Sequence, residues 1–207
     1  SLDGLSLTMA ADERSFCCVD SGKLQLISFS TLRPRDVYHA SDGYEIVSGI
    51  GLAEDALYTA LVERKASHYR LRLIRMLDGM AATLAESDEP LSDPIPRPRR
   101  ASVLYRRGDG LWLANYDAQQ DRPLKLNEGK AIAAHWSPDG RTILYLNAPA
   151  EPRKLNNIRE NTPDTNEDRF VADTTQFAAF APNSDATMFV GASGSKASPH
   201  VLLLARA

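Results

Sequence analysis

Two short stretches of the sequence carry side chains that could bind and process a carboxylate-bearing ligand. In the first, Asp93 offers a carboxylate that can act as a base if burial favours its protonated form. Arg97 offers a planar guanidinium that can hold a carboxylate through two hydrogen bonds. In the second, His135 and Trp136 are neighbours that could hydrogen-bond to a sugar ring and stack on it.

Each of these residues also has a purely structural interpretation. Asp93 precedes a proline, where an aspartate commonly caps the backbone at a turn or at the start of a strand. Arg97 could form an ion pair between neighbouring sheets, and His135 beside Trp136 could belong to a hydrophobic core. Both interpretations stay open at the level of sequence.

Other chemical motifs are missing from the sequence. It contains no glycine-rich phosphate loop, no HExxH motif and no Cys/His zinc spacing. The chain has four histidines, and their places in the sequence do not favour convergence on one ion: His39, His68, His135 and His200. We therefore predict no metal site from these residues. Cys17 and Cys18 are adjacent, which predicts two reduced thiols that point to opposite faces of a strand.

Composition narrows the class of protein. The chain has 207 residues, a net charge of −3 and 43% hydrophobic residues, which predicts a globular fold. The slightly negative charge does not favour nucleic acid as a partner. No apolar run approaches the ~18 residues of a membrane-spanning helix.

A repeat of about forty residues is the main structural signal. Five segments each combine apolar stretches, a turn and a polar hairpin, and the turn residues that align are 42, 45, 40 and 44 residues apart: Ala11, Ala53, Pro98, Pro138 and Pro182. This spacing is typical of a β-propeller blade. We predict an all-β propeller of five four-stranded blades in one domain over 1–207. The blade ranges are roughly 1–42, 43–88, 89–130, 131–173 and 174–207.

Local patterns agree with strands. Residues 137–140, Ser-Pro-Asp-Gly, are typical of a turn. Arg70, Arg72 and Arg75 lie along one strand and could form an edge for an anionic ligand, but we predict that they lie on the solvent side of an outer strand. Residues 56–67 are predicted as a strand by their register with the other repeats, although their propensities also permit a helix. Residues 161–168 are polar and contain a proline, which predicts an exposed loop.

The repeats resemble those of two propeller families. Ser137-Pro138-Asp139-Gly140 followed by Arg-Thr-Ile-Leu-Tyr-Leu is similar to the inner hairpin of TolB-like propellers. Three stretches resemble oligogalacturonate lyases: 92–98 resembles their Gly-His-Pro-Ile-Tyr-Arg-Pro, 136–140 their Trp-x-Pro-Asp-Gly, and 185–191 their Asp-Gly-Ser-Leu-Met-Val-Gly. This resemblance implies a bacterial seven-bladed propeller that cleaves pectin-derived oligouronides by β-elimination.

The chain departs from the lyases at their catalytic and metal-binding histidines. Asp93 stands at the position of the catalytic histidine, and Ala133 stands where a metal-binding histidine is expected. The remaining metal ligands belong to a His-Pro-His stretch of a later blade, so Mn²⁺ is expected only if further blades supply its ligands. We therefore expect the five segments to be the middle blades of a longer propeller, with a compact five-bladed ring as the alternative.

Two functional hypotheses follow. In the first, the chain belongs to an oligouronide lyase whose activity is lost, altered or dependent on further blades, with Asp93 at the catalytic position and Arg97, His135 and Trp136 binding substrate. In the second, it is a non-catalytic TolB-like propeller that binds a protein or a small acidic ligand. The lyase resemblance implies a cytoplasmic protein, and the TolB-like one a periplasmic protein. Neither hypothesis includes a membrane or nucleic acid as partner.

Overall fold

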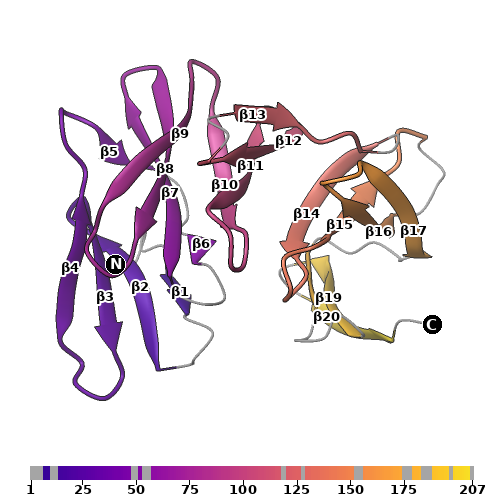
Figure 1. Cartoon of the computed structure of the whole chain (residues 1–207). Coiled ribbons are helices and arrows are strands. Elements are labelled where there is room, and N and C mark those ends of the chain that lie inside the picture. Colours follow the sequence, from indigo (N-terminus) through magenta and orange to yellow (C-terminus); the bar gives the residue numbers. More distant parts are fainter. Residues whose placement is uncertain are drawn as a thin grey trace. The chain divides into compact units, whose positions relative to one another are not determined.

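The structure is a computed structural model, and within the residues that it describes the regular elements are all strands (Figure 1). The described residues are 7–9, 14–47, 51–52, 57–117, 120–126, 129–151, 156–173, 179–182, 188–195 and 198–205. Their strands form antiparallel sheets, which confirms the prediction of an all-β chain. In the same residues no helix is long and apolar enough to cross a membrane.

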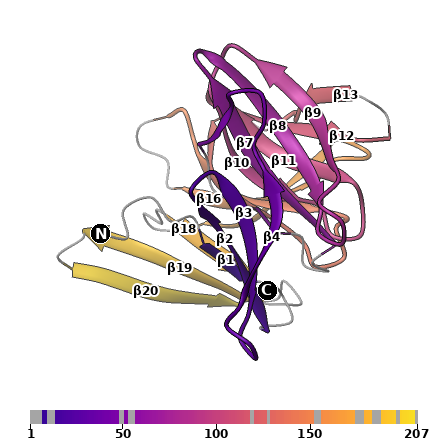
Figure 2. The same ribbon diagram turned by 90° about the vertical axis from the view of Figure 1, so that its left-hand side faces the viewer.

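The chain divides into two compact units, Ser1–Pro123 and Leu124–Ala207. The first unit, unit 1, holds three sheets of consecutive strands (Figure 2). Sheet 1 has the order β1 (Leu7–Met9), β2 (Ser15–Asp20), β3 (Lys23–Ser28), β4 (Pro34–His39). In sheet 2, β5 (Glu45–Ile46) and β6 (Gly51–Leu52) both pair with β7 (Tyr58–Lys65), which is followed by β8 (His68–Arg75) and β9 (Ala81–Ser87). Sheet 3 has the order β10 (Leu91–Pro96), β11 (Ser102–Arg107), β12 (Gly110–Asn115), β13 (Gln120–Pro123).

The second unit, unit 2, holds two sheets. Sheet 4 has the order β14 (Lys130–Trp136), β15 (Ile143–Ala148), β16 (Asn157–Thr162), β17 (Glu167–Asp173). Sheet 5 has the described strands β18 (Ala179–Pro182), β19 (Met188–Ser195) and β20 (Ser198–Ala205). Sheets 1, 2, 3 and 5 lie inside the predicted blade ranges, and sheet 4 begins one residue before its range. The number of blades, ring closure and the single domain stay predictions.

Residues 58–65 form a strand, which rules out the helical alternative for this segment. The strand is buried from Thr59 to Glu63 because other sheets cover both of its faces. Leu61 packs toward Cys17 and Leu24 of sheet 1, while Ala60 and Val62 pack toward sheet 3. Strands that are covered on both faces carry continuous apolar runs, which explains why the sequence also permitted a helix.

The turn predicted at 137–140 is present and is held by its own side chains. Ser137 Oγ donates to Asp139 Oδ1 at 2.7 Å, and the Arg141 N–H donates to the same carboxylate oxygen at 2.9 Å. Hydrogen bonds from the Arg141 N–H and from Ser137 lower the pKa of Asp139. Gly140 takes the left-handed conformation, with φ of 68°, that ends the turn.

The loop predicted at 161–168 is shorter in the structure. Asn161 lies in β16 and is fully buried, and its Nδ2 donates to the Lys125 carbonyl at 3.2 Å. The turn covers only 163–166, and β17 begins at Glu167. The polar residues of this segment extend the strands of the hairpin because their side chains form hydrogen bonds within the sheet. Asp168 on β17, for example, accepts a hydrogen bond from Arg159 Nε on β16 at 2.9 Å.

Sheets 3 and 4 each contain a hydrogen bond between a tyrosine on the second strand of the sheet and an aspartate on the fourth. Tyr105 Oη donates to Asp121 at 2.7 Å in sheet 3, and Tyr145 Oη donates to Asp168 at 2.6 Å in sheet 4. Both tyrosines are fully buried. Burial, followed by the hydrogen bond to Asp121, raises the pKa of Tyr105.

The change Tyr145→Phe removes one of these hydrogen bonds without leaving a large cavity. We expect the free energy of unfolding to fall by about 1.5–3 kcal/mol, because the bond joins a buried hydroxyl to a carboxylate. Urea denaturation measures this difference. Tyr116→Phe is the control, since Tyr116 is 51% exposed and its change should cost less than about 0.5 kcal/mol. Equal effects of the two changes would contradict a stabilising role for the Tyr145 bond.

Candidate functional site

Asp93 lies in an irregular part of β10. The pairing of β10 with β11 shifts register between Ser92 and Ile95, and Asp93 in this bulge has a φ of 49°. A left-handed conformation is unusual for a non-glycine residue inside a strand, and residues held in this way cost about 1–3 kcal/mol and cluster at functional sites. The bulge turns the Asp93 carboxylate outward, so that its side chain is 65% exposed and lacks the burial that would favour its protonated form.

Arg106 on β11 is the cation beside Asp93. Its Nε lies 2.9 Å from Asp93 Oδ2, and its side chain is only 12% exposed. Sequence analysis did not single out this pair, although the hairpin pairing of β10 with β11 places Ser92 opposite Arg106. In this pair the Asp93 carboxylate can accept a proton, and the largely buried Arg106 guanidinium can hold the carboxylate of a ligand.

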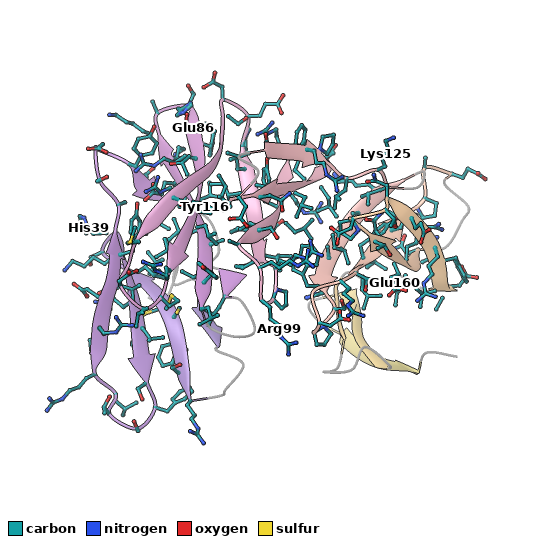
Figure 3. All side chains as sticks on the ribbon, in the orientation of Figure 1. His39, Glu86, Arg99, Tyr116, Lys125 and Glu160 are labelled. Carbon is teal, nitrogen blue, oxygen red and sulfur yellow. The ribbon has the colours of Figure 1, made fainter. Side chains whose placement is uncertain are left out.

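Arg97 follows β10 directly and is 3% exposed. Its backbone N–H donates to the Ser102 carbonyl at 2.8 Å, which closes the connection between β10 and β11. Arg99 in the same connection takes a left-handed φ of 60° and is exposed (Figure 3). The structure therefore places Arg97 in the same sheet as Asp93 but mostly out of reach of solvent. Its substrate-binding role stays a prediction.

Gly51 on β6 fixes the backbone of β10 next to Asp93. A Cβ atom on Gly51 would lie 1.9 Å from the Pro94 carbonyl oxygen and 2.5 Å from Pro96 Cδ. Thr59 Oγ1 donates to the Gly51 carbonyl at 2.8 Å and holds β6 in place. Only a residue without a side chain permits this close approach of sheets 2 and 3.

His135 and Trp136 lie in unit 2, on β14. His135 is opposite Leu144 in the sheet and is half-buried, while Trp136 is opposite Ile143 and is 7% exposed. Burial of this degree is typical of a tryptophan that packs in a core. The predicted contact of these two residues with a sugar stays a prediction.

The described residues do not fit a manganese site. Among them, no group of three His, Cys, Asp or Glu side chains comes together in a way that could hold a metal ion. His68 on β8 instead faces two carboxylates, with Nδ1 at 3.1 Å from Asp88 and Nε2 at 3.8 Å from Glu86. His39 is exposed at the end of β4, and the side chain of His200 lies outside the described part (Figure 3). We derive no catalytic step through a metal.

A second group of polar side chains lies between sheets 1 and 2, and sequence analysis singled out only its two arginines. We call this group the Glu63 cluster; it consists of Tyr38, Tyr44, Glu63, Arg70 and Arg72. Glu63 is fully buried, and Arg70 is 9% exposed, so the prediction that Arg70 lies on a solvent-facing side is wrong. The antiparallel register explains the burial, because it places Arg70 directly opposite Glu63.

A cavity of about 120 Å³ lies between sheets 2 and 3. Its lining includes Tyr58, Leu73, Met80, Ala82 and Tyr116. Two of the large side chains that line it are exposed, with fractions of 64% for Met80 and 51% for Tyr116. Exposed apolar groups that gather around a cavity are typical of a binding surface.

Comparison with known proteins gives the class of fold. The solved structures that the chain matches include β-propeller proteins, and the chain has their fold. No protein-family model matches its sequence, and no curated protein matches it either.

Two oligogalacturonate lyases are among the similar structures. One, from Vibrio parahaemolyticus, has a TM-score of 0.83 and 20% identity over 97% of this chain and 62% of its own. The other, in complex with manganese, has a TM-score of 0.81 and 20% identity over 92% of this chain and 58% of its own. TolB from Acinetobacter baumannii has a TM-score of 0.73 and 10% identity over 97% of this chain and 51% of its own. The chain thus spans about three fifths of the length of the two lyases.

Proposed function

We propose that the chain is part of an oligogalacturonate lyase-like propeller that acts on oligouronides. The observation that carries this proposal is the pair of Asp93 and Arg106 on β10 and β11, with Asp93 in a left-handed conformation and mostly exposed. The similarity in fold to oligogalacturonate lyases supports the choice of an acidic sugar as substrate. The resemblance of residues 92–98 to the stretch that carries the catalytic histidine of these lyases supports Asp93 as the reacting group.

The chemistry of β-elimination requires a base and a cation at the same uronate ring. Asp93 accepts the proton from C5, the electron pair of that C–H bond forms the C4–C5 double bond, and the C4–O bond to the leaving sugar breaks. The leaving oxygen takes a proton from water. Arg106 holds the uronate carboxylate and stabilises the negative charge that develops on it as the proton leaves.

The bulge in β10 is what makes this assignment physically reasonable. In a regular strand, successive side chains point to opposite faces of the sheet. The register shift between Ser92 and Ile95 changes that alternation at Asp93 and leaves its carboxylate in solvent while it still reaches Arg106. Bulges commonly redirect a side chain beside an active site.

The variant Asp93→Asn tests the proposal in the complete protein. We expect the rate of unsaturated product formation from oligogalacturonides, followed by ultraviolet absorbance, to fall by about 100-fold or more, because asparagine cannot accept the proton. Binding of the oligogalacturonide, measured by calorimetry, should change much less. Asp109→Asn is the matched control, because Asp109 is an exposed carboxylate in a hairpin of the same sheet. Unchanged turnover in Asp93→Asn, or no turnover in the complete wild-type protein, would reject the lyase proposal.

A second candidate function is a non-catalytic, TolB-like binding module for a protein. The observation that favours it is the cavity of about 120 Å³, whose lining includes the exposed side chains of Met80 and Tyr116. This volume is close to that of an engineered cavity that admits benzene, so it fits one apolar side chain of a partner. Two results together would favour this candidate. The complete protein would show no turnover of oligogalacturonides, and Met80→Asp would weaken the binding of a partner protein more than the control Leu32→Asp, which changes an exposed leucine outside the cavity lining.

A further inference from the structure

The Glu63 cluster contains more positive than negative charge. Arg70 Nε is hydrogen-bonded to Glu63, and Arg72 Nε lies 3.8 Å from the same carboxylate. Glu63 is fully buried, and the side chains of Arg70 and Arg72 are 11% and 14% exposed. Glu86 is opposite Arg70 on β9, but its carboxylate is 57% exposed and lies beside His68. One buried carboxylate thus faces two guanidinium groups, and an uncompensated charge in such a place is costly.

Two donors of the cluster have no acceptor. Arg70 Nη2 and Arg72 Nε are both buried, and neither has a hydrogen-bond partner in the described part of the chain. Arg72 uses its other nitrogens on Thr83 Oγ1 and on the Ala81 carbonyl, so its Nε is the atom left over. Buried donors without partners are rare in proteins and commonly indicate a bound water or ion.

The tyrosines of the cluster add no acceptor for these nitrogens. Tyr38 Oη donates to Glu63 Oε1 at 2.7 Å and so occupies the second oxygen of the carboxylate. The Tyr44 ring lies over Arg70, with the guanidinium carbon 3.6 Å from the ring centre. Tyr44 belongs to the exposed turn after β4, where its N–H donates to the Ser41 carbonyl at 3.1 Å. Tyr44 is therefore the side chain that covers Arg70 on the solvent side.

We propose that the Glu63 cluster binds one small monoanion, which accepts hydrogen bonds from Arg70 Nη2 and Arg72 Nε. A single negative charge would balance the second guanidinium and give both nitrogens an acceptor. Entry of the anion requires the Tyr44 ring to move off Arg70. The anion is either a free halide or carboxylate ion, or the carboxylate of a uronic acid. The proposal stands on residues of sheets 1 and 2 and does not depend on the lyase proposal for sheet 3.

Thermal unfolding of the full chain in three sodium salts tests this proposal. We expect chloride, acetate or galacturonate to raise the Tm by about 3–6 °C at ten times its dissociation constant, since the anion binds the folded chain only. A response to chloride and acetate identifies a free-ion site, whereas a response to galacturonate alone identifies the carboxylate of an acidic sugar. Rises that are the same in wild type and Arg70→Gln for every salt would overturn the proposal.

Two substitutions at the cluster should change the response in opposite directions. Arg70→Gln removes one donor group and one positive charge, so the specific rise in Tm should disappear. Glu63→Gln removes the competing carboxylate, so the same anion should bind more tightly and act at lower concentration. A cluster with only a structural role would lose stability in both variants with no change in salt response. Glu45→Gln is the control, since its ion pair with Arg64 is exposed and its salt response should match wild type.

Bromide diffraction gives a direct readout that does not rely on stability. Crystals of wild-type protein in sodium bromide should show an anomalous peak within hydrogen-bond distance of Arg70 Nη2 and Arg72 Nε, and crystals of Arg72→Gln should lose that peak. This measurement keeps the proposal testable if Glu63→Gln fails to fold. A water molecule at this position instead of bromide, together with equal salt responses in wild type and Arg70→Gln, would overturn the proposal. The two nitrogens would then be hydrogen-bonded to water alone.

Discussion

The change Glu63→Ala should lower the free energy of unfolding by about 3–5 kcal/mol, because it leaves buried charges without their partner. Glu63 is fully buried and is the only carboxylate paired with Arg70 and Arg72 in the described part of the chain. Its removal also leaves the Tyr38 hydroxyl without its acceptor. Urea denaturation in a buffer free of chloride and carboxylates measures the difference.

Glu45→Ala is the matched control for this prediction. Glu45 also pairs with an arginine, Arg64, but the two side chains are 62% and 43% exposed. Exposed ion pairs of this kind contribute about 0.2–1 kcal/mol, so the control should be close to wild type. A loss below about 1 kcal/mol in Glu63→Ala would mean that water already reaches Arg70 and Arg72.

Gly51→Ala is expected to cost about 3 kcal/mol, at the upper end of the range for overpacked sites. The added methyl group would meet the Pro94 carbonyl oxygen at 1.9 Å, and a backbone atom cannot turn aside as a side chain can. The strain should also affect Asp93, which directly precedes Pro94 in the chain. We therefore expect Gly51→Ala to impair the proposed lyase reaction as well as the stability measured in urea.

The control for Gly51 is Gly110→Ala in β12. A Cβ atom at Gly110 would meet Trp112 Nε1 at 3.2 Å, which is a side-chain atom that can shift by a small amount. We expect a loss of less than about 1 kcal/mol there. A Gly51→Ala protein as stable as the Gly110→Ala protein would contradict the close approach of β6 to β10.

The repeat in the sequence was enough to predict an all-β chain, and the reason is physical. Each sheet needs turns at regular intervals along the chain. Turns favour particular residue types, such as the glycine at 140, and these can be recognised in the sequence. The segment 56–67 was harder, because β7 is covered on both faces and its apolar residues follow no clear period. Its register with the other repeats, rather than its propensities, predicted the strand correctly.

The candidate site was only partly predictable. Asp93 was found through its resemblance to a catalytic position, but its bulge and its contact with Arg106 depend on register, which a single sequence does not specify. Arg70 shows the same limit. An arginine that alternates with apolar residues normally marks a solvent face, and only the partner strand shows that Glu63 lies opposite and permits burial.

The double coverage of sheet 2 has a consequence for how unit 1 loses its structure. One hydrophobic cluster joins sheet 2 to sheet 1, and another joins it to sheet 3. In a linear array whose members interact only with their neighbours, the middle member couples the two ends. Opening of sheet 2 therefore uncouples sheet 1 from sheet 3, whereas sheet 1 can fray while the pair of sheets 2 and 3 keeps its own core. The amide protons of β7 and β8 should accordingly mark the last region of unit 1 to become accessible to solvent.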